Sequence, residues 1–297
     1  MQPVIKLENV TKHYGSAVGI ENLDLEVQKG QVFGFLGPNG AGKSTTINML
    51  IDFIRPTSGS IKIFGLDSVE GSIEIRSKLG FLASDFALDK GLTGWQQLEY
   101  FGHLRGNFDK KYITQLAERL ECKLDKKFRH LSRGNKQKVG LIVALMHKPS
   151  LLIFDEPTSG LDPIIQEEFN KIILEQKALG VTTFISSHIL SEVQEICDHV
   201  AFIRSGKLIV SKPLSEIMDT SQKQIFIKGL NSADAKSLIS KLKVTNAQFE
   251  PKSLSFNYSG DINQLVSSLA KYKVSDVSIK PTDLESIFMN YYEDKNA

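Results

Sequence analysis

The stretch Gly37-Pro38-Asn39-Gly40-Ala41-Gly42-Lys43-Ser44 has the spacing G-x-x-x-x-G-K-S and decides the fold of the chain around it. A continuous apolar run, residues 32–36, precedes this stretch, and a helix-forming segment beginning at Thr45 follows it. A strand, a glycine-rich loop and a helix in this order form a phosphate-binding loop. Backbone N–H groups turn inward there, at a helix N-terminus, and hold phosphate oxygens. The sequence therefore predicts a nucleotide site.

The residues of this loop have separate expected tasks. Lys43 is expected to reach the β- and γ-phosphates, and the hydroxyl of Ser44 is expected to hold Mg²⁺. The other loop residues expected to contact the nucleotide are Gly37, Asn39, Gly40, Gly42 and Thr45.

A second apolar run, residues 151–154, ends at two adjacent carboxylates, Asp155 and Glu156. We expect Asp155 to hold Mg²⁺ through its water shell, whereas Glu156 points to the other side of the pleat. A glutamate at that place can orient the water that attacks the γ-phosphate or take its proton. The phosphate loop and this acidic pair together predict nucleotide hydrolysis.

The pattern around both motifs is α/β. Residues 32–36, 151–154 and 182–186 are continuous apolar or β-branched runs, typical of strands buried on both faces of a parallel sheet. Residues 4–10 and 23–27 alternate between apolar and polar, which predicts half-exposed strands. Between Thr93 and Pro149 strand signals vanish, so the sequence predicts an inserted helical subdomain.

Composition limits the other possibilities. The 297 residues suggest two domains. Basic and acidic residues number 36 and 34, and a net charge of +2 excludes capture of nucleic acid by net charge alone. The longest apolar stretch, residues 139–146, is far shorter than the roughly 20 residues of a membrane-spanning helix. Cys122 and Cys197 lie too far apart for a metal or redox motif.

A shift in composition marks a second domain. All glycines except Gly229 and Gly260 precede residue 221, and no arginine follows Arg204. We place the domains at residues 1–215 and 221–297. The second has a β-α-β-β-α-β-α order that resembles a ferredoxin-like unit. Its expected strands are 224–228, 244–249, 253–258 and 274–280, and its expected helices are 233–242, 262–272 and 282–292.

The phosphate loop alone is compatible with a GTPase, a kinase or a motor protein. A GTPase carries an Asn-Lys-x-Asp motif, but the nearest string, Asn135-Lys136-Gln137-Lys138, lacks the aspartate. The string Leu131-Ser132-Arg133-Gly134-Asn135, about 20 residues before the acidic pair, resembles instead the signature sequence of ATP-binding cassette (ABC) transporters. Ser159-Gly160-Leu161-Asp162 looks like the D-loop of that family, and His188 looks like its switch histidine.

The resemblance covers residues 4–212 and implies a P-loop NTPase cassette. Such a cassette has a RecA-like core, an N-terminal antiparallel β subdomain and a helical subdomain, here about 93–149. Tyr14 takes the place of the aromatic residue that stacks on adenine. By the same resemblance His188 contacts the γ-phosphate, and Ser132, Gly134 and Asp162 contact nucleotide across a dimer.

The resemblance also implies partners and a location. Cassettes of this family close as head-to-tail dimers, with ATP between the phosphate loop of one subunit and the signature of the other. We expect an ATPase subunit that powers a separate transmembrane permease from the inner face of the cell membrane, in the cytoplasm. It is expected to pair with a second cassette in a homodimer, and a different cassette as the partner stays an alternative. Signature variants of this kind resemble those of bacterial exporters of peptides and antibiotics, so export of such an amphipathic compound is expected. We expect no nucleic-acid partner.

Two departures from the family pattern stand out. Arg133 and Asn135 replace a glycine and a glutamine of the signature. Ser84 stands where the family has the glutamine of its Q-loop, and a serine is too short to span the same distance to Mg²⁺. The effect of this change on metal contact and on coupling to a permease stays open.

Two alternative functions remain at this point. A soluble cassette ATPase that acts on DNA or ribosomes usually has two fused cassettes or a long coiled-coil insertion, and this chain has neither. A regulator that uses ATP as a switch would not need Glu156 and His188. The role of residues 221–297 stays open between regulation, dimer stabilisation and support of the fold.

Overall fold

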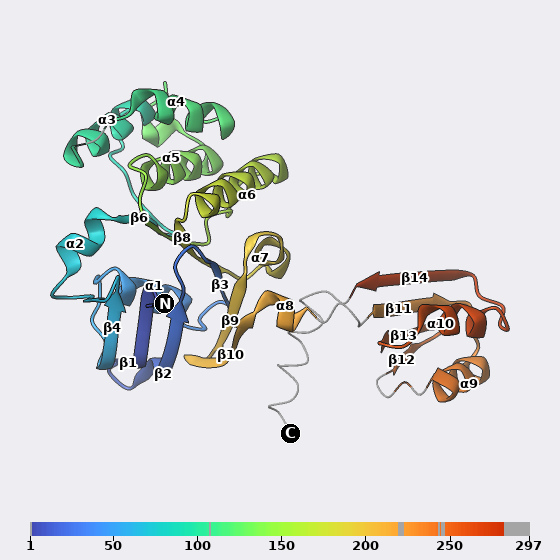
Figure 1. The fold of residues 1–297 in the computed structure, drawn as a ribbon. Coiled ribbons are helices and arrows are strands. Elements are labelled where there is room, and N and C mark those ends of the chain that lie inside the picture. The colour runs from blue at the N-terminus through green and yellow to red at the C-terminus, as the bar shows by residue number, and fades with distance from the viewer. Residues whose placement is uncertain (1, 107, 219–222, 243, 245–246, 282–297) are drawn as a thin grey trace. The chain divides into compact units, whose positions relative to one another are not determined.

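A computed structural model describes residues 2–106, 108–218, 223–242, 244 and 247–281. The chain divides into two compact units, Met1–Leu214 and Ser215–Ala297 (Figure 1).

The first unit contains an antiparallel sheet near its N-terminus. Its strands, in spatial order, are β2 (Ala17–Val27), β1 (Ile5–Tyr14), β4 (Ser58–Ile63) and β5 (Leu66–Asp67). Ile5 and Leu7 of β1 are buried, as the alternating pattern predicts, and the alternation is broken at Asn9, where the pairing register of the strand shifts and Val10 and Thr11 are both buried. The buried apolar side chains of β1 form one apolar cluster with residues of β3 and α1, so the phosphate loop lies against a rigid support.

A six-stranded sheet forms the centre of the first unit. Its strands, in spatial order, are β10 (Lys207–Pro213), β9 (His199–Arg204), β3 (Val32–Leu36), β8 (Thr182–Ser187), β7 (Leu151–Asp155) and β6 (Leu79–Leu82). The strands from β9 to β6 run parallel, and β10 is antiparallel to β9. Every residue of β3, β7 and β8 is buried, which confirms the interpretation of the continuous apolar runs.

The three central neighbours, β3, β8 and β7, end at one edge of the sheet. The phosphate loop follows β3 and leads into α1 (Lys43–Leu50), Glu156 follows β7, and His188 follows β8. Parallel strands bring their carboxyl ends together, and ligands of open α/β sheets bind at this edge. Motifs more than 100 residues apart in the chain therefore meet.

Helices fill the region expected to be helical. They are α3 (Gly94–Leu104), α4 (Lys110–Arg119), the 3₁₀ helix η1 (Phe128–His130) and α5 (Arg133–Leu145). Thr93 caps α3 through a capping box with Gln96, and Ser132 caps α5. In Figure 1 these helices gather at the end of the unit away from β1, β2 and β4. The remaining helices are α2 (Ser72–Ser77), α6 (Pro163–Ala178), α7 (Leu190–Ile196) and α8 (Leu214–Ile217).

The second unit is a four-stranded antiparallel sheet with helices on one face. Its elements are β11 (Lys223–Lys228), α9 (Ser232–Leu242), β12 (Ala247–Glu250), β13 (Ser253–Tyr258), α10 (Ile262–Leu269) and β14 (Asp276–Pro281). The spatial order β12-β13-β11-β14 is that of the expected ferredoxin-like fold. Buried residues of β11 and β13 pack on α9 and α10. The helix expected at 282–292 lies outside the described residues.

Candidate functional site

The phosphate loop has the backbone conformation that its glycines predict. Gly40 and Gly42 have φ angles of 78° and 112°, in the region that favours glycine. A Cβ on Gly42 would lie 2.5 Å from a side-chain carbon of Ile20 and 2.9 Å from the carbonyl oxygen of Gly19. A larger residue would therefore push the loop away from β2. A cavity of about 200 Å³ opens over the loop, lined by Gly19, Asn39, Gly40, Gly42, Lys43, Ser44, Thr45 and Glu156.

Three serine hydroxyls surround the carboxylate of Asp155, which is almost fully buried. Ser44 Oγ and Ser84 Oγ both donate to Asp155 Oδ2, over 2.8 Å and 3.0 Å. Ser186 Oγ donates to Asp155 Oδ1 over 2.5 Å. The expected pair Ser44 and Asp155 therefore lies together, and Ser84 adds a third oxygen that sequence reasoning did not place there.

Glu156 has a strained backbone, with a φ angle of 51°. Its N–H donates to the carbonyl oxygen of Ser186 over 3.2 Å and to the hydroxyl of Ser186 over 3.1 Å. These bonds to β8 hold the conformation, which turns the carboxylate toward the phosphate loop. Strain of this kind at a strand end is common in functional sites.

The ammonium group of Lys43 and the imidazole of His188 both contact the Glu156 carboxylate. Lys43 Nζ lies 3.6 Å from Glu156 Oε1, and His188 Nδ1 lies 3.0 Å from the same oxygen. Lys43 also donates to the carbonyl oxygen of Gly37 over 2.7 Å. Burial lowers the pKa of Lys43, and the charges of Glu156 and Asp155 oppose that shift. Of the residues expected to do the chemistry, Lys43 and His188 thus both contact Glu156.

Tyr14 lies at the end of β1, half exposed. A Cβ on Gly19 would lie 2.9 Å from Cε2 of the Tyr14 ring, and Gly19 also lines the phosphate-loop cavity. The ammonium of Lys12 stands over the same ring, 5.4 Å from its centre. The aromatic face is therefore next to the cavity, where an adenine can stack on it.

The signature lies against the D-loop of the same chain. Arg133 donates from Nη2 to Ser159 Oγ over 2.9 Å. A Cβ on Gly134 would lie 2.6 Å from the carbonyl oxygen of Gly160, so only glycine permits this close approach. Ser132 accepts from the N–H of Asn135, and Asp162 accepts from the N–H of Ile165. Both residues are therefore helix N-caps in this chain.

The structure thus brings some expected residues together and separates others. The phosphate loop, Asp155, Glu156 and His188 form one cluster, whereas Ser132, Gly134 and Asp162 do not line the phosphate-loop cavity. Helix α5 is 13 residues long, and its N-terminal turn is partly accessible. A helix N-terminus attracts an anion, so the signature can meet a phosphate group from outside its own chain.

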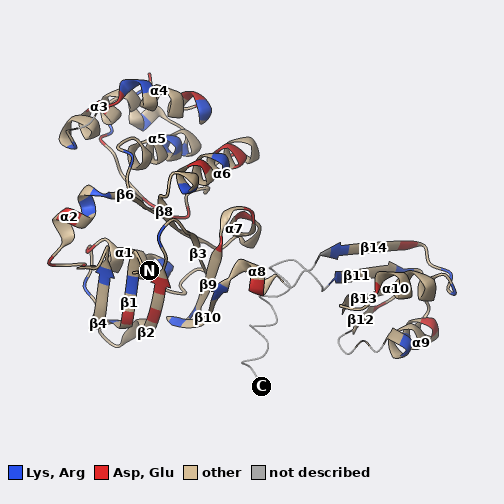
Figure 2. Cartoon of the chain, viewed as in Figure 1, with Lys and Arg blue, Asp and Glu red and all other residues tan. Residues whose placement is uncertain are grey.

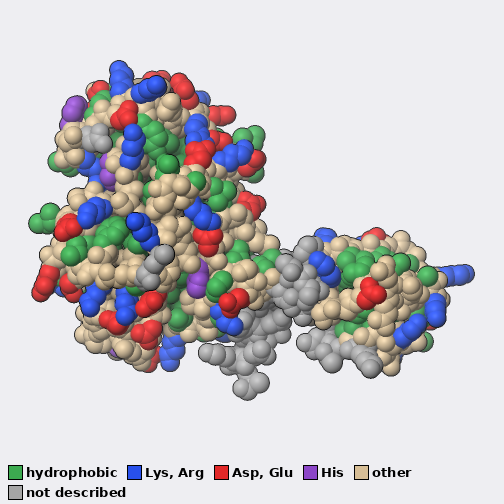
Figure 3. Space-filling view, in the orientation of Figure 1, with side chains coloured by type: hydrophobic (Ala, Val, Ile, Leu, Met, Phe, Trp, Pro, Cys, Tyr) green, Lys and Arg blue, Asp and Glu red, His purple; other side chains and the backbone are tan. Residues whose placement is uncertain are grey.

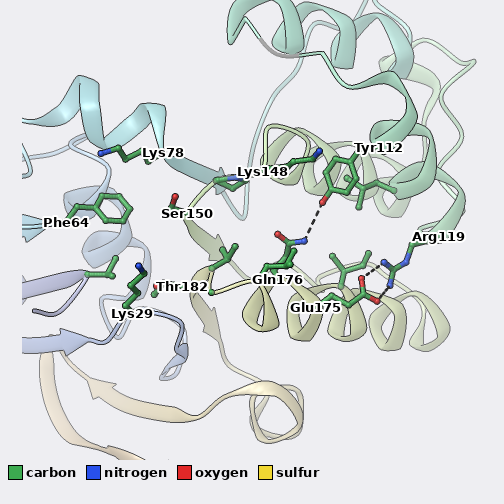
Figure 4. A pocket seen from close by; sticks show the side chains of 17 residues that line it. Lys29, Phe64, Lys78, Tyr112, Arg119, Lys148, Ser150, Glu175, Gln176 and Thr182 are labelled. Atoms are coloured by element: carbon green, nitrogen blue, oxygen red, sulfur yellow. Dashed lines mark hydrogen bonds and ion pairs between the residues drawn. The ribbon is translucent and has the colours of Figure 1, made fainter. Parts of the chain in front are cut away.

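A larger pocket, of about 730 Å³, opens at the opposite edge of the six-stranded sheet. Figure 4 shows its labelled side chains, which come from β8, α4, α6 and the connecting loops. Lys29, Ser150 and Thr182 lie there near the amino ends of strands. None of the residues named so far for nucleotide chemistry lines this pocket.

Comparison with known proteins identifies the family. The family model described as "ABC transporter" matches residues 20–159. The bacitracin transport ATP-binding protein BcrA of Bacillus licheniformis is 39% identical over 228 residues, which are 76% of this chain and 74% of BcrA. "Uncharacterized ABC transporter ATP-binding protein YcbN" of Bacillus subtilis (strain 168) is 31% identical over 97% of both chains. This chain belongs to the ABC transporter family, as an ATP-binding subunit with ATPase activity.

A solved structure supports the same fold. The dimeric structure of MJ0796, a bacterial ABC transporter cassette, matches with a TM-score of 0.63 and 25% identity, over 71% of this chain and 98% of that one. The expected cassette fold and the resemblance to ABC transporter ATPases are therefore confirmed. Subunits of this class partner with membrane permeases and dimerise. In the described residues no helix is long and apolar enough to cross a membrane.

Three site residues escaped sequence reasoning. Ser186 belongs to a run interpreted only as a buried strand, yet its hydroxyl holds Asp155 and Glu156. Gly19 lines the phosphate-loop cavity from β2, far from any motif. The sequence marks Ser84 only as a departure from the family pattern and does not predict its contact with Asp155. All three are small residues at or near the end of a strand. Such residues are too common in a sequence for this feature to predict a functional site.

Proposed function

We propose that Mg²⁺-ATP binds at the carboxyl edge of the six-stranded sheet and is hydrolysed there to power a separate membrane permease. The observation that carries the proposal is the contact of Glu156 with both Lys43 and His188 beside the Asp155 cluster. The residues proposed to hold the nucleotide are Tyr14, Gly37, Asn39, Gly40, Gly42, Lys43, Ser44, Thr45 and, from a second subunit, Ser132, Gly134 and Asp162.

The residues present fit Mg²⁺. This cation prefers oxygen ligands, uses few protein groups and keeps waters and substrate phosphates around it. The oxygens of Ser44 and Asp155 are 2.8 Å apart, close to the about 2.9 Å that separates neighbouring ligands in an octahedron of 2.0–2.1 Å bonds. Ser44 and Asp155 are the residues proposed to hold the cation, which would neutralise phosphate charge when bound.

Glu156 is the proposed general base. Its carboxylate orients the attacking water and accepts a proton from it as the oxygen bonds to the γ-phosphorus and ADP leaves. When the phosphates of ATP attract Lys43, one hydrogen-bonding competitor of that carboxylate is removed. His188 Nδ1, 3.0 Å from Oε1, keeps the carboxylate in place, and His188 is the residue proposed to contact the γ-phosphate. Lys43 stabilises the charge that develops on the phosphoryl oxygens.

The active assembly is proposed to be a head-to-tail homodimer. In one chain, the signature does not line the cavity of the phosphate loop. A second copy supplies the free N–H groups at the start of α5, and these close the site over the γ-phosphate. The dimeric structure of MJ0796 supports this arrangement.

The permease is proposed to dock in a groove of about 600 Å³ beside the site. The segment from Ser84 to Leu88 forms one wall, and Phe128 and residues of α5 form the other. Because Ser84 also touches Asp155, a partner in the groove contacts a segment joined directly to the catalytic cluster. We place the subunit accordingly at the inner face of the cell membrane.

The cargo is proposed to be a peptide antibiotic or a similar amphipathic compound, moved outward. The name of the relative BcrA, a bacitracin transport ATP-binding protein, supports this class. Residues 1–215 are proposed to bind and hydrolyse ATP. Residues 221–297 are proposed to regulate the dimer, since YcbN shares the length that includes them.

Action on DNA or ribosomes is the second candidate. Basic and acidic residues are interspersed along the helices and strands of the first unit (Figure 2), and the face in Figure 3 shows the same mixture. A nucleic-acid backbone requires a continuous basic surface, which this face lacks. The observations therefore favour the permease.

A pull-down tests the proposal. Tagged Glu156→Gln protein is captured from native membranes in detergent with Mg²⁺-ATP, and its partners are identified by mass spectrometry. We expect a stoichiometric membrane protein with several spans, and no such partner without nucleotide. Capture of ribosomal or DNA-associated proteins alone would overturn the transport function and leave the nucleotide chemistry.

A further inference from the structure

Strand β14 forms one edge of the sheet in the second unit (Figure 1). Among the described residues it pairs with β11 alone, so its other side has no neighbouring strand there. An edge strand presents backbone N–H and C=O groups to any further strand, and charged residues and proline commonly protect such an edge. In β14 that protection stands at one end, at Lys280 and Pro281. The strand has six residues, which is an ordinary length for pairing.

The two apolar residues of β14 are exposed on the face of the sheet that carries the helices. Val277 and Ile279 lie opposite Ile227 and Ile225 of β11, which are buried in the cluster that β11 forms with α9 and α10. Val277 and Ile279 themselves are 37% and 39% exposed. The apolar face therefore continues beyond the helices to the open edge, where a further strand with apolar residues in register can cover it.

The sequence of β14 is complementary to itself when two copies run antiparallel. If Ser278 lies opposite Ser278 of a second copy, Asp276 of each copy lies opposite Lys280 of the other. Val277 then lies opposite Ile279, on the face that carries the helices. Opposite charges and pairs of β-branched residues in these positions stabilise a sheet. A two-fold axis at Ser278 makes each pairing twice.

The charges select this register among its neighbours. An axis one residue earlier, at Val277, places Asp276 opposite Ser278, and an axis one residue later places Lys280 opposite Ser278. Either shift leaves both charges without an opposite charge across the ladder. Within one chain the carboxylate of Asp276 is 4.0 Å from Lys228 Nζ, a long and exposed ion pair, so it can accept a second cation.

We propose that β14 pairs with β14 of a second copy of the chain, antiparallel about Ser278, so that the sheets of the two second units become one continuous sheet. The inference rests on the proposed function, which supplies the homodimer. A short ladder buries little surface, but either contact between two chains raises the effective concentration for the other. This pairing involves no residue of the nucleotide site, so it holds the two chains together when the nucleotide has left.

Crosslinking tests the position of the axis in the full chain without nucleotide. Ser278→Cys places two thiols opposite each other across the axis, within reach of a short bismaleimide. Ser255→Cys is the matched control, because Ser255 lies on the same face of the sheet but on the inner strand β13. The parent contains Cys122 and Cys197 and reports any crosslink that does not involve the new thiol. We expect a covalent dimer from Ser278→Cys alone.

Charge reversal tests the register. Lys280→Asp gives each copy two acidic residues at these positions, and Asp276→Lys gives each copy two lysines, so either variant alone opposes like charges. We expect the dissociation constant of the nucleotide-free dimer, from sedimentation equilibrium, to rise about tenfold in each. An equimolar mixture of the two variants pairs an acid with a lysine at both ends and should return to within about threefold of the parent. Thermal unfolding reports whether each variant folds.

Two results overturn the inference. Equal crosslinking of Ser278→Cys and Ser255→Cys, or none in either, shows that the axis does not lie at Ser278. A mixture that pairs no better than its separate variants shows that the charges do not face each other.

The two proposals fail separately. A Glu156→Gln chain that dimerises with Mg²⁺-ATP, but gives no crosslink at Ser278 without nucleotide, contradicts the edge pairing and leaves the proposed function standing. A chain that crosslinks at Ser278 but does not bind Mg²⁺-ATP overturns the proposed function and leaves the edge pairing.

Discussion

The two edges of the six-stranded sheet differ in size and in chemistry. The amino edge has the larger pocket, about 730 Å³, whereas the cavity over the phosphate loop at the carboxyl edge measures about 200 Å³. At the amino edge two lysines are each paired with a carboxylate of their own, Lys78 with Glu74 and Lys148 with Asp109, 2.7 Å and 3.0 Å apart. At the carboxyl edge Lys43 and His188 share a single carboxylate, Glu156.

This difference indicates which of the two cavities is the nucleotide site. Ion pairs at a protein surface contribute little to the stability of the fold, and their charged groups already have a partner other than a ligand. At the carboxyl edge, Lys43 and His188 both contact the carboxylate of Glu156, whose backbone is strained. Such an arrangement is typical of a site prepared for the negative charge of a ligand or of a transition state. The smaller cavity is therefore the proposed site of the chemistry, and variants at the two edges can be compared in pairs.

The largest expected effect is on turnover. Glu156→Gln should lower the rate of ATP hydrolysis about 10²- to 10⁴-fold because it removes the proposed base. ATP binding should persist. The matched change at the amino edge, Glu175→Gln, removes a carboxylate that pairs with Arg119, and turnover should stay within about twofold. Steady-state phosphate release measures both, and comparable losses in the two variants would contradict the account.

Nucleotide affinity gives the second comparison. Lys43→Ala should weaken ATP binding about 10- to 100-fold, the value of one or two charge-assisted bonds to phosphate. Lys29→Ala changes a lysine that lines the amino-edge pocket and should leave affinity unchanged. Titration calorimetry separates the outcomes. Weaker binding in Lys29→Ala would move the nucleotide to the larger pocket.

The bond between the signature and the D-loop should have a smaller effect. Arg133→Ala and Ser159→Ala each remove one partner of the same 2.9 Å bond at the surface. We expect a two- to fivefold loss of turnover in each, and no further loss in the double variant, because exposed contacts contribute little. Additive losses in this double-mutant cycle would mean that the two residues act separately.

The smallest effect on turnover is expected from His147, which contacts the carbonyl oxygen of Leu79 at the start of β6. Burial lowers its pKa from 6.5 to about 4 in the folded chain. Between these values the unfolded chain binds a proton that the folded chain does not, so the free energy of unfolding decreases as pH falls from 6.5 to 4. Above pH 6.5 this contribution is complete.

Replacement tests this direction. A His147→Gln variant should lose stability less steeply than the wild type over that interval, as chemical denaturation at a series of pH values measures. Turnover at neutral pH should be nearly unchanged. If the free energy of unfolding depended on pH equally steeply in the wild type and in the variant, a group other than His147 would control the acid sensitivity.

Much of the fold and of the carboxyl edge could be predicted from the sequence. Buried parallel strands are continuous apolar runs, and the glycines of the phosphate loop are required by local backbone geometry, so both leave a local signal. The contacts of Ser186 and Ser84 with Asp155 depend on which strands lie side by side, and no local pattern encodes that order. The bond from Arg133 to Ser159 escaped for the same reason.

Photolabelling with 8-azido-ATP tests the central assignment most directly. The probe, bound to Glu156→Gln protein with Mg²⁺ and irradiated, marks the residues next to the adenine, which peptide mass spectrometry then identifies. We expect label on the hairpin that carries Tyr14, and unlabelled ATP should compete with this labelling. Label on Phe64 or Tyr112, in the amino-edge pocket, would contradict it.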